Sequence, residues 1–363
     1  MSKREYNVDL FRIVATLFVI VLHVLGQGGI LYRTTLDSAG YWTAWFLEIA
    51  SYGAVDCFAL ISGYVMVDKS VKLKSIIGLW FQAVFYSAVL SWLIFAFFPA
   101  TQTVTNMHAA FLPISYRQWW YMSSYFGLFF FIPALNAVVK HLPRKTLKKI
   151  LLVVLVGVGI LDCAANKDAY SLIGGYSAAW LVVAYLFGAY IKKYNLKEKF
   201  TVLKGVLGYL AMTLLTLLTK VGIRHIVKVV GGDINLDFMF ISYTSITVFL
   251  GAIFLFLGFL NIRVGKAPAK VIAFLSPATL GVYLIHVHPL VFQNVIRDAF
   301  ATYSTATPAV LAFCVIAVTL GVYLCCTIID LLRIRLFMLL HIPQLSALLD
   351  KGITLAYRKV FER

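Results

Sequence analysis

A series of long apolar stretches constrains this chain more than any other feature of its sequence. A transmembrane helix needs about 20 predominantly apolar residues, and ten stretches of roughly that length follow one another along the 363 residues. The chain is 61% hydrophobic with a mean hydropathy of +0.89, whereas soluble domains are about half apolar. We therefore predict an all-α polytopic membrane protein with about ten transmembrane helices. The predicted spans are residues 8–31, 42–67, 73–98, 117–139, 147–165, 172–191, 201–220, 238–260, 271–292 and 307–332.

The basic residues are distributed unevenly between the predicted loops. With the N-terminus inside, the inner segments hold 25 of the 32 Lys and Arg residues and the outer loops hold 7. Cytoplasmic loops of membrane proteins carry such an excess. We therefore expect both termini in the cytoplasm, which an even number of spans also requires. The net charge of +17 reflects this bias and an attraction to anionic lipid, so a nucleic-acid partner has little support.

The chain is expected to form one membrane domain over residues 1–335. The tail 336–363 is too short for a core of its own, and its interleaved apolar and basic residues predict an amphipathic segment on the inner membrane surface. The longest outer connections, about 99–116 and 221–237, are candidates for a mouth or lid. The five cysteines predict neither a disulfide framework nor a metal site, because no Cys or His spacing of ligand type occurs.

Ionisable residues inside the first predicted span are the leading functional candidates, since such residues are costly in a bilayer. Asp9 and Arg12 are three residues apart and are expected to pair near the cytoplasmic end. His23 follows Arg12 by eleven residues, about three helical turns or ~16 Å, so both side chains are predicted to face the same side. One helix face would then connect the inner leaflet with a histidine in the outer half of the membrane.

Three further ionisable residues inside predicted spans are candidates, and one of them, His286, is predicted at a depth similar to that of His23. His286, in the ninth span, is about as far from the start of its helix as His23 is from the start of the first. The second span runs from outside to inside and carries Glu48 near its outer end and Asp56 about two turns deeper. The four side chains would surround one cavity if the helices pack accordingly, which the sequence alone does not decide.

These intramembrane residues also have structural interpretations. A single histidine in a span often serves only as a hydrogen-bonding group, and His286 could satisfy a carbonyl freed by Pro289. Asp9 and Arg12 could form nothing more than an ion pair at the membrane interface.

Two groups near the predicted membrane surfaces are explained most simply by structure. For Asp330 and Arg333 we favour an interfacial ion pair. Trp119, Trp120 and Tyr121 are typical of an aromatic belt at the outer interface, with stacking on a sugar ring as the functional alternative.

Four stretches, in this order, resemble segments of the acyltransferase family 3 of integral membrane proteins, which acylate sugars of bacterial surface polysaccharides. The first is VDLFRIVATLFVIVLHV, in which ten residues separate Arg12 from His23. The others are AVDCFALISGYVM in the second span, WWYMSSYFGLFFFIPALN in the fourth and LGVYLIHVHPL in the ninth. The resemblance covers most of the chain.

The resemblance implies an acyl-CoA donor, usually acetyl-CoA, reached from the cytoplasm, and an acceptor hydroxyl on a cell-surface or lipid-linked glycan. It implies the bacterial cytoplasmic membrane as the location, and His23 with Arg12 as the functional pair of the first span. Many members have arginines at the start of the third span, where this chain has Lys72 and Lys74. Lysine neutralises a phosphate but lacks the bidentate fork of arginine, which weakens the case for donor binding at this loop.

The residue types suit acyl transfer to a hydroxyl without a metal. An imidazole titrates near neutral pH and can take the hydroxyl proton when positioned, and a guanidinium suits the phosphates of CoA. No nucleophile for a covalent acyl intermediate is indicated. The catalytic candidates are His23, His286, Glu48 and Asp56, the donor-binding candidates are Arg12, Lys72 and Lys74, and the acceptor-binding candidates are Trp119, Trp120 and Tyr121.

Two other kinds of membrane protein remain as alternatives. A transporter or flippase would also use intramembrane charges and outer aromatics, but the sequence shows no inverted repeat, although Pro289 leaves room for a broken helix. A membrane-bound O-acyltransferase of the unrelated histidine-containing class would have its central histidine late in the chain. The early pair of Arg12 and His23 argues against this class. The acceptor sugar, the acyl chain and the oligomeric state are not indicated.

Overall fold

The computed structural model describes residues 4–35, 38–230 and 238–361, and this part of the chain is helical without strands. Seven of its helices are long and apolar enough to cross a membrane. The chain is therefore a multi-pass membrane protein, and the predicted all-α class is confirmed. The seven are Tyr6–Leu25, Ala39–Met66, Leu73–Phe97, Trp120–His141, Val202–Val227, Lys266–His286 and Pro308–Leu339.

Three of the ten predicted spans are shorter helices in the structure. α9 (Ala178–Lys193) has 16 residues, α11 (Ile246–Phe259) has 14, and α7 (Arg144–Val156) has 13 before it continues as a π-helical segment. The predicted spans include apolar residues that lie in loops, such as 238–245 ahead of α11. Ten crossings and cytoplasmic termini therefore stay predictions.

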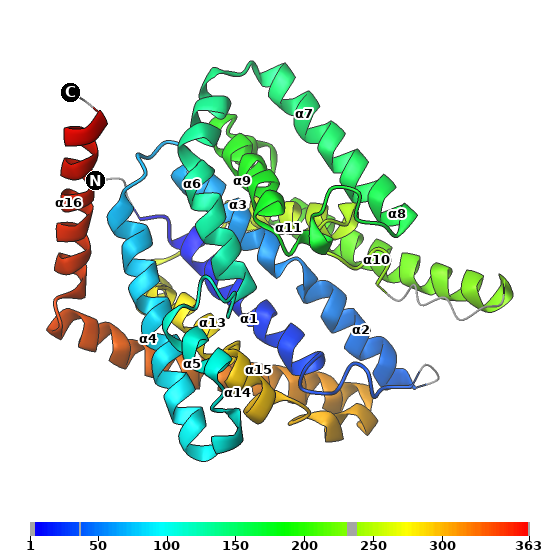
Figure 1. The fold of residues 1–363 in the computed structure, drawn as a ribbon. Helices are drawn as coiled ribbons and strands as arrows, with labels where there is room; N and C mark the ends of the chain where they lie inside the picture. Colours follow the sequence, from blue (N-terminus) through cyan, green and yellow to red (C-terminus); the bar gives the residue numbers. More distant parts are fainter. Residues whose placement is uncertain (1–3, 36–37, 231–237, 362–363) are drawn as a thin grey trace.

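Helix α1 (Tyr6–Leu25) lies in the middle of the bundle (Figure 1). It packs against α2 (Ala39–Tyr52), α3 (Ala54–Met66), α13 (Thr279–His286) and α15 (Pro308–Leu339). Because other helices surround α1, most of its side chains face protein. Ionisable groups on this helix are thereby shielded from lipid.

Glycines set two close helix contacts near the centre. α2 and α3 form one span that breaks at Gly53, where a Cβ would press on the side chain of Ala252 and the carbonyl of Val248 in α11. Gly63 of α3 and Gly188 of α9 face each other's helix so closely that a Cβ on either would overlap the partner's backbone. Small residues allow such backbone approach in membrane proteins, and they fasten the short helices α9 and α11 to α3.

The two long connections predicted as a mouth or lid differ from that expectation. The first contains the 3₁₀ turn Pro99–Thr101 and the short helix α5 (Val104–Phe111). In the second, residues 221–230 continue helix α10 (Val202–Val230), and residues 231–237 lie outside the described residues. Arg224, His225 and Lys228 interrupt the apolar pattern of this stretch, but they do not end the helix.

The remaining helices complete the bundle. α4 (Leu73–Phe97) and α6 (Trp120–His141) flank α13, and α12 (Lys266–Leu275) is joined to α13 through a 3₁₀ turn at Pro277. Smaller elements are α8 (Cys163–Ala165), α14 (Pro289–Val291), a π-helical turn Phe292–Ile296, and the 3₁₀ turns Ile173–Gly175, Leu196–Lys199 and Ala301–Thr305.

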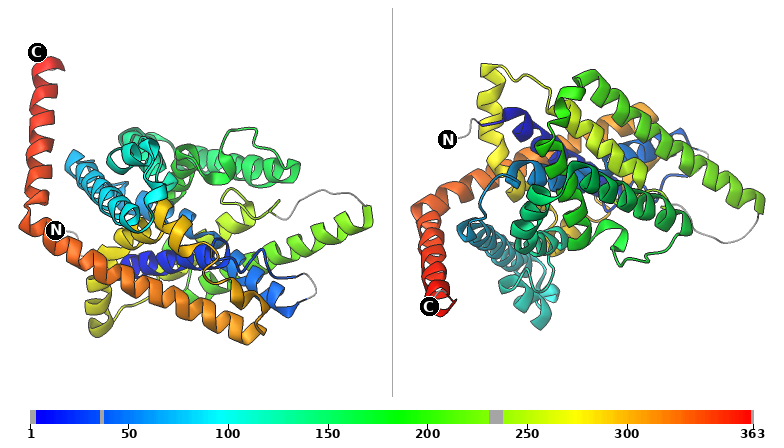
Figure 2. Two further views of the ribbon diagram at one scale, coloured as in Figure 1. Left: turned by 60° about the horizontal axis from the view of Figure 1, so that its bottom comes forward. Right: turned by 90° about the horizontal axis from the view of Figure 1, so that it is seen from above.

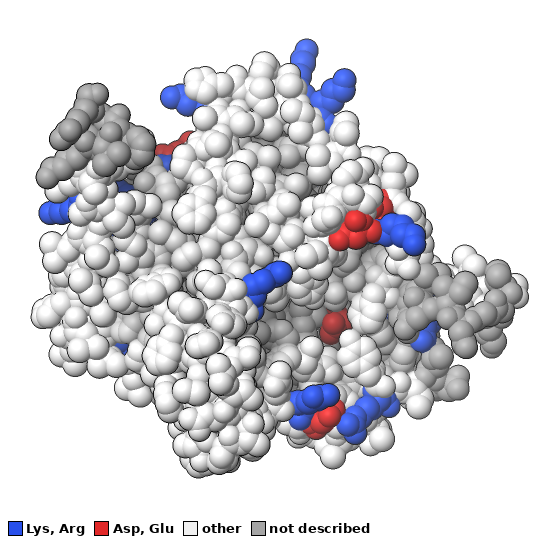
Figure 3. Space-filling model, in the orientation of Figure 1, with Lys and Arg blue, Asp and Glu red and all other residues white. Residues whose placement is uncertain are grey.

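Helix α16 (Ile342–Phe361) leaves the bundle at an angle, and its first part contacts α4 (Figures 1 and 2). Leu348 and Ile353 are exposed on it beside Lys351, so the amphipathic tail predicted from the sequence is helical. Its place on the inner membrane surface stays a prediction. The face of the protein in Figure 3 is mostly uncharged, with few Lys, Arg, Asp and Glu side chains, as expected of a surface that contacts lipid.

Candidate active site

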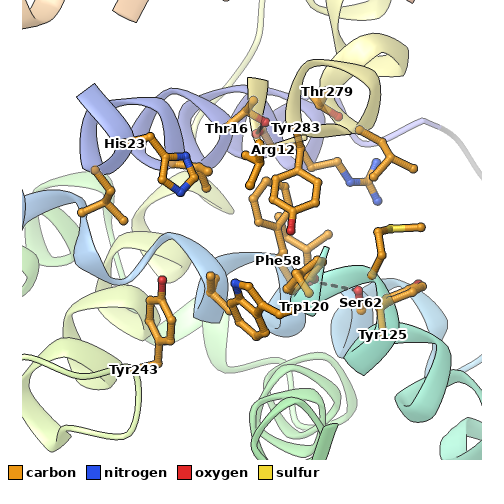
Figure 4. Close-up of a pocket in the computed structure, with 18 of the residues that line it drawn as sticks. Arg12, Thr16, His23, Phe58, Ser62, Trp120, Tyr125, Tyr243, Thr279 and Tyr283 are labelled. Carbon is orange, nitrogen blue, oxygen red and sulfur yellow. Dashed lines mark hydrogen bonds between the residues drawn. The ribbon is translucent and has the colours of Figure 1, made fainter. Parts of the chain in front are cut away.

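A cavity of about 280 Å³ lies between α1, α3, α6 and α13 (Figure 4). Arg12 and His23 both belong to its wall, at opposite ends of the face that α1 presents. Their spacing predicted a shared helix face, and the cavity confirms it. The wall consists of Arg12, Thr16, Val19, Leu22, His23, Val55, Phe58, Ile61, Ser62, Leu79, Trp120, Tyr121, Met122, Tyr125, Tyr243, Thr279, Leu280, Tyr283 and Val287.

At one end of the cavity, Arg12 pairs with Asp9 as predicted. Nη1 of Arg12 donates to Oδ1 of Asp9 at 2.8 Å, and Nε of Arg4 donates to Oδ2 of the same carboxylate at 2.6 Å. Two guanidiniums thus share one carboxylate, which leaves a net positive charge. Within the described residues, Arg12 uses only one of its nitrogens in hydrogen bonding, so the rest of its fork is available to an anion.

At the other end, His23 contacts His286. Nδ1 of His23 lies 3.2 Å from Nε2 of His286, and Nδ1 of His286 lies 2.6 Å from the carbonyl oxygen of Val282. The ring of Phe292 meets that of His23 edge to face, with centroids 5.3 Å apart. His286 is buried with 3% of its surface exposed, and it does not belong to the cavity wall.

The contact with Val282 determines which ring nitrogens carry protons in the neutral pair. A carbonyl oxygen only accepts, so Nδ1 of His286 must donate and its Nε2 must be bare. Nδ1 of His23 then donates to that bare nitrogen, which leaves Nε2 of His23 without a proton. His23 is therefore held in the tautomer whose free lone pair can accept a proton.

Glu48 and Asp56 do not join His23 in the way the sequence suggested. Asp56 is fully buried and accepts a hydrogen bond from Nε1 of Trp180 at 2.8 Å, which turns it towards α9. Glu48 is buried further along α2, with 6% of its surface exposed, outside the cavity wall. The expected meeting of four ionisable residues is thus wrong for these two, because the break at Gly53 directs α2 and α3 to different neighbours.

The three predicted aromatic residues take different positions. Trp120 and Tyr121 line the cavity, whereas Trp119 is buried with 1% exposed and packs on His288 at 5.6 Å between ring centroids. Part of the predicted belt is therefore interior.

Tyr176 and Tyr243 were missed by sequence reasoning. The ring of Tyr176 lies 4.5 Å from that of Trp120, and Tyr243 belongs to the cavity wall. Both stand in connections without helical periodicity, where only the glycine pair before Tyr176 signals a special backbone.

The lysines of the predicted donor loop lie outside the cavity wall. Lys72 and Lys74 are exposed at the start of α4, and the cavity is reached by Leu79 further along the same helix. Any contact with a donor would involve parts of it that extend beyond the cavity.

A second polar cluster is buried between α4, α13 and α15, and we call it the Asp330 network. Oδ1 of Asp330 accepts from the hydroxyl of Tyr86 at 2.7 Å, from Gln82 at 3.4 Å and from Arg333 at 2.8 Å, and Oδ2 accepts from Arg333 at 2.8 Å. Asp330 is fully buried and lies against Gly281 of α13, where a Cβ would overlap its carboxylate. The predicted pair exists, but it is part of a buried network and is not an isolated surface pair.

The described residues contain no group of three or more His, Cys, Asp and Glu side chains placed to hold a metal ion. In comparisons with known proteins, a family model described as an acyltransferase domain matches residues 5–327. This range includes every residue of the cavity wall. No curated protein and no solved structure matches the chain.

Proposed function

This chain belongs to the acyltransferase family whose model it matches, and on that premise we propose that it moves an acetyl group from cytoplasmic acetyl-CoA to a glycan hydroxyl. The glycan would be at the cell surface or lipid-linked, and the membrane would be the bacterial cytoplasmic membrane. One observation carries the proposal: a single cavity has a guanidinium at one end and a histidine with a free lone pair at the other.

Arg12 is proposed to bind a phosphate of the donor. Its side chain is 33% exposed and keeps unused donors among the described residues, and the second guanidinium on Asp9 adds positive charge beside it. Hydrogen bonds between guanidinium and phosphate are charge-assisted and therefore strong. With the phosphates at this end, the pantetheine arm would lie along the aromatic wall, and the thioester would reach the region of His23.

His23 is proposed to act as the general base. Its Nε2 takes the proton of the acceptor hydroxyl while the hydroxyl oxygen attacks the thioester carbonyl carbon. The tetrahedral intermediate then collapses, the bond between carbon and sulfur breaks, and the leaving thiolate receives the proton from Nε2. The products are an O-acetylated glycan and CoA, so atoms and charges balance.

His286 is proposed to position His23. It does not belong to the cavity wall itself, and both of its ring nitrogens are engaged, one of them by His23. Its hydrogen bond to Val282 fixes the tautomer of His286, which in turn fixes that of His23. This arrangement gives the base the correct protonation state before substrate arrives.

The direct test uses purified protein, [14C]acetyl-CoA and an extract of surface polysaccharide. We expect label in the glycan together with an equal amount of free CoA, measured by chromatography, and neither product without the protein. Accumulation of intact label inside proteoliposomes, with no free CoA, would contradict the proposal and support a transporter.

A further inference from the structure

Several polar side chains in the cavity wall already use their hydrogen-bond donors. The hydroxyls of three wall residues donate to backbone carbonyls at 2.9 Å, and these residues are Thr16, Ser62 and Thr279. The hydroxyl of Tyr125 donates to Sδ of Met66 at 3.8 Å, and the hydroxyl oxygen of Tyr283 is fully buried. These five hydroxyls are engaged or sealed, so none of them is ready to donate to a substrate.

The indole N–H of Trp120, in contrast, has no acceptor among the described residues. Three other indoles are placed differently: Nε1 of Trp180 donates to Asp56 at 2.8 Å, and Nε1 of Trp45 and of Trp119 are fully buried. Nε1 of Trp120 does not belong to that buried group, and Figure 4 shows it pointing into the cavity. Because an indole nitrogen only donates, Trp120 presents an oriented N–H to a molecule in the cavity.

The hydroxyl of Tyr243 is a second donor beside it. The rings of Tyr243 and Trp120 stack, with centroids 6.0 Å apart and 23° between their planes. Only 5% of Tyr243 is exposed, yet its hydroxyl reaches the cavity, and in Figure 4 it points from the wall opposite α1 towards His23. The hydroxyl of Tyr176 lies nearby and can donate to it, which leaves the proton of Tyr243 for a ligand.

The connection that precedes α9 is held in an unusual conformation next to this pair. The carboxylate of Asp168 accepts from the backbone N–H groups of Leu172 at 2.7 Å and Ile173 at 2.8 Å. A positive φ at a β-branched residue such as Ile173 is strained, and such strain persists where surrounding contacts enforce it. Positive φ occurs here at Asn166, Ser171, Ile173, Gly174 and Gly175.

This connection fixes the position of Tyr243. The carbonyl of Gly174 accepts from the backbone N–H of Tyr243 at 3.2 Å, and at the φ of +100° of Gly175 an added Cβ would run into Cβ of Tyr243. Only glycine allows the chain to pass so close before it turns the ring of Tyr176 onto that of Trp120, at 4.5 Å between centroids. Both donors are therefore held in place by the fold itself.

Acyl transfer to a hydroxyl places negative charge on the carbonyl oxygen of the thioester. When the acceptor oxygen bonds to the carbonyl carbon, one electron pair of the C=O bond moves onto its oxygen, and it returns when the C–S bond breaks. His23 takes a proton in this step and does not stabilise the oxygen. Arg12 lies about three helical turns, or ~16 Å, further along α1. Donors aimed at the developing oxyanion are usually the largest single contribution to catalysis in such reactions.

We propose that the indole N–H of Trp120 and the hydroxyl of Tyr243 form the oxyanion hole of this reaction, an assignment that rests on the proposed function. The acceptor hydroxyl approaches the thioester carbon from the side of His23, and the carbonyl oxygen faces the two donors on the opposite wall. Because the donors are fixed before substrate binds, they stabilise the charge without reorganisation during the reaction. The surrounding aromatic rings exclude water and thereby strengthen both contacts.

Infrared difference spectroscopy of bound acetyl-CoA, labelled with 13C at the acetyl carbonyl, tests the contact without any acceptor. A hydrogen bond to the carbonyl oxygen weakens the C=O bond and lowers its stretching frequency. Trp120→Phe and Tyr243→Phe each keep an aromatic ring and lose only the donor, so we expect the labelled band to move to higher frequency in both. A band that stays at its wild-type position in both variants would overturn the assignment.

Turnover supplies the second measurement. With saturating glycan and acetyl-CoA, kcat should fall about a hundredfold to a thousandfold in each variant, as is typical for the loss of one oxyanion donor. The dissociation constant of acetyl-CoA and the melting temperature should stay close to wild type, because the donors act mainly on the transition state. Wild-type kcat in both variants would contradict the assignment as well.

Two variants serve as matched controls for the infrared band. Tyr121→Phe removes a hydroxyl from the same wall, but Tyr121 belongs to another aromatic group, with its ring 6.2 Å from Tyr125 and 6.1 Å from Tyr283. Trp92→Phe changes a tryptophan of α4 that is 47% exposed and lies outside the wall. Both should leave the band at its wild-type position. A shift in Tyr121→Phe as large as that in Trp120→Phe would show that the donors are not the proposed pair.

Acetyl-CoA binding and label transfer by the wild type separate this assignment from the proposed function. A wild-type protein that does not bind acetyl-CoA would refute both. Binding and transfer to glycan, with an unmoved carbonyl band in Trp120→Phe and Tyr243→Phe, would refute the oxyanion hole and keep the proposed function.

Discussion

The Asp330 network and the cavity of α1 are both polar and both buried among helices, yet their hydrogen bonding differs. In the Asp330 network each carboxylate oxygen is engaged, and the partners come from two helices. In the cavity, as far as the structure describes the chain, Arg12 keeps unused donors and Nε2 of His23 keeps a free lone pair. The hydrogen-bonding capacity of the polar side chains is thus fully used in the Asp330 network and partly unused in the cavity.

The difference separates a structural role from a chemical one. A buried ion pair with complete hydrogen bonding fixes the positions of its helices, and it has no capacity left for a ligand. Groups with spare capacity at a cavity can respond to a substrate. The Asp330 network lies against Gly281 and so supports α13, while the cavity holds the groups that would act on substrate.

The largest effect on turnover is expected when His23, the proposed base, is replaced. His23→Gln keeps an amide that can hydrogen-bond to His286 but cannot take a proton, so turnover should fall about a hundredfold to ten-thousandfold. Acetyl-CoA affinity and the melting temperature should stay close to wild type. A stable His23→Gln protein that acetylates glycan at nearly the normal rate would show that His23 is not the base.

Removal of Asp330 tests the structural role of the Asp330 network. Asp330→Ala leaves Arg333 buried without its partner, and the free energy of unfolding should fall by about 3 to 5 kcal/mol. Chemical denaturation of purified protein measures this loss, and turnover per folded molecule should be nearly unchanged. As a control, the double variant Asp330→Leu with Arg333→Leu should regain most of the stability, because no charge is left uncompensated. Normal stability with lost turnover would reverse the comparison.

A smaller effect is expected at the donor end of the cavity, where Arg12 lies. Arg12→Ala should weaken acetyl-CoA binding by roughly tenfold to a hundredfold, as expected for a charge-assisted contact of about 1.5 to 3 kcal/mol. Arg12→Lys should restore part of the affinity, since the fork is lost. Arg4→Ala is the matched control, because Arg4 also pairs with Asp9 but lies outside the cavity wall. Equal affinities for Arg12→Ala and Arg4→Ala would leave Arg12 as a structural partner of Asp9.

The smallest effect is expected at the exposed lysines. Replacement of Lys72 and Lys74 by Gln should change acetyl-CoA affinity by no more than about fivefold, because exposed charges contribute at most about 1 kcal/mol. The difference should shrink further in high salt. An effect larger than that of Arg12→Ala would show that the donor phosphates lie at this loop and that the cavity end is secondary.

The sequence was most informative where a single helix decides the outcome. Arg12 and His23 lie on one helix, so their spacing and the helical period are sufficient to place both on one face. The apolar stretches likewise predicted an all-helical membrane protein. Helix lengths were less predictable, because a connection such as 238–245 is as apolar as a span and only its tertiary packing makes it a loop.

Contacts between distant segments could not be predicted in this way. Asp56 turns to Trp180, a partner 124 residues away, and Glu48 follows a different path because the helix breaks at Gly53. Tyr176 and Tyr243 reach Trp120 from connections whose conformation depends on Asp168 and on positive φ angles. No periodic pattern in the sequence indicates such contacts, so these aromatic neighbours of Trp120 could be identified only from the fold.

The hydrogen bond from His286 to Val282 has a consequence for proton movement through the membrane. A peptide carbonyl does not accept a full proton. The chain of two imidazoles therefore ends at Val282 and cannot conduct a proton further. A proton taken up by His23 must return to the cavity, and in the proposed reaction the CoA thiolate removes it. The cycle then transfers no net charge through α1, so we expect acetyl transfer in proteoliposomes to proceed at the same rate when an ionophore abolishes the membrane potential.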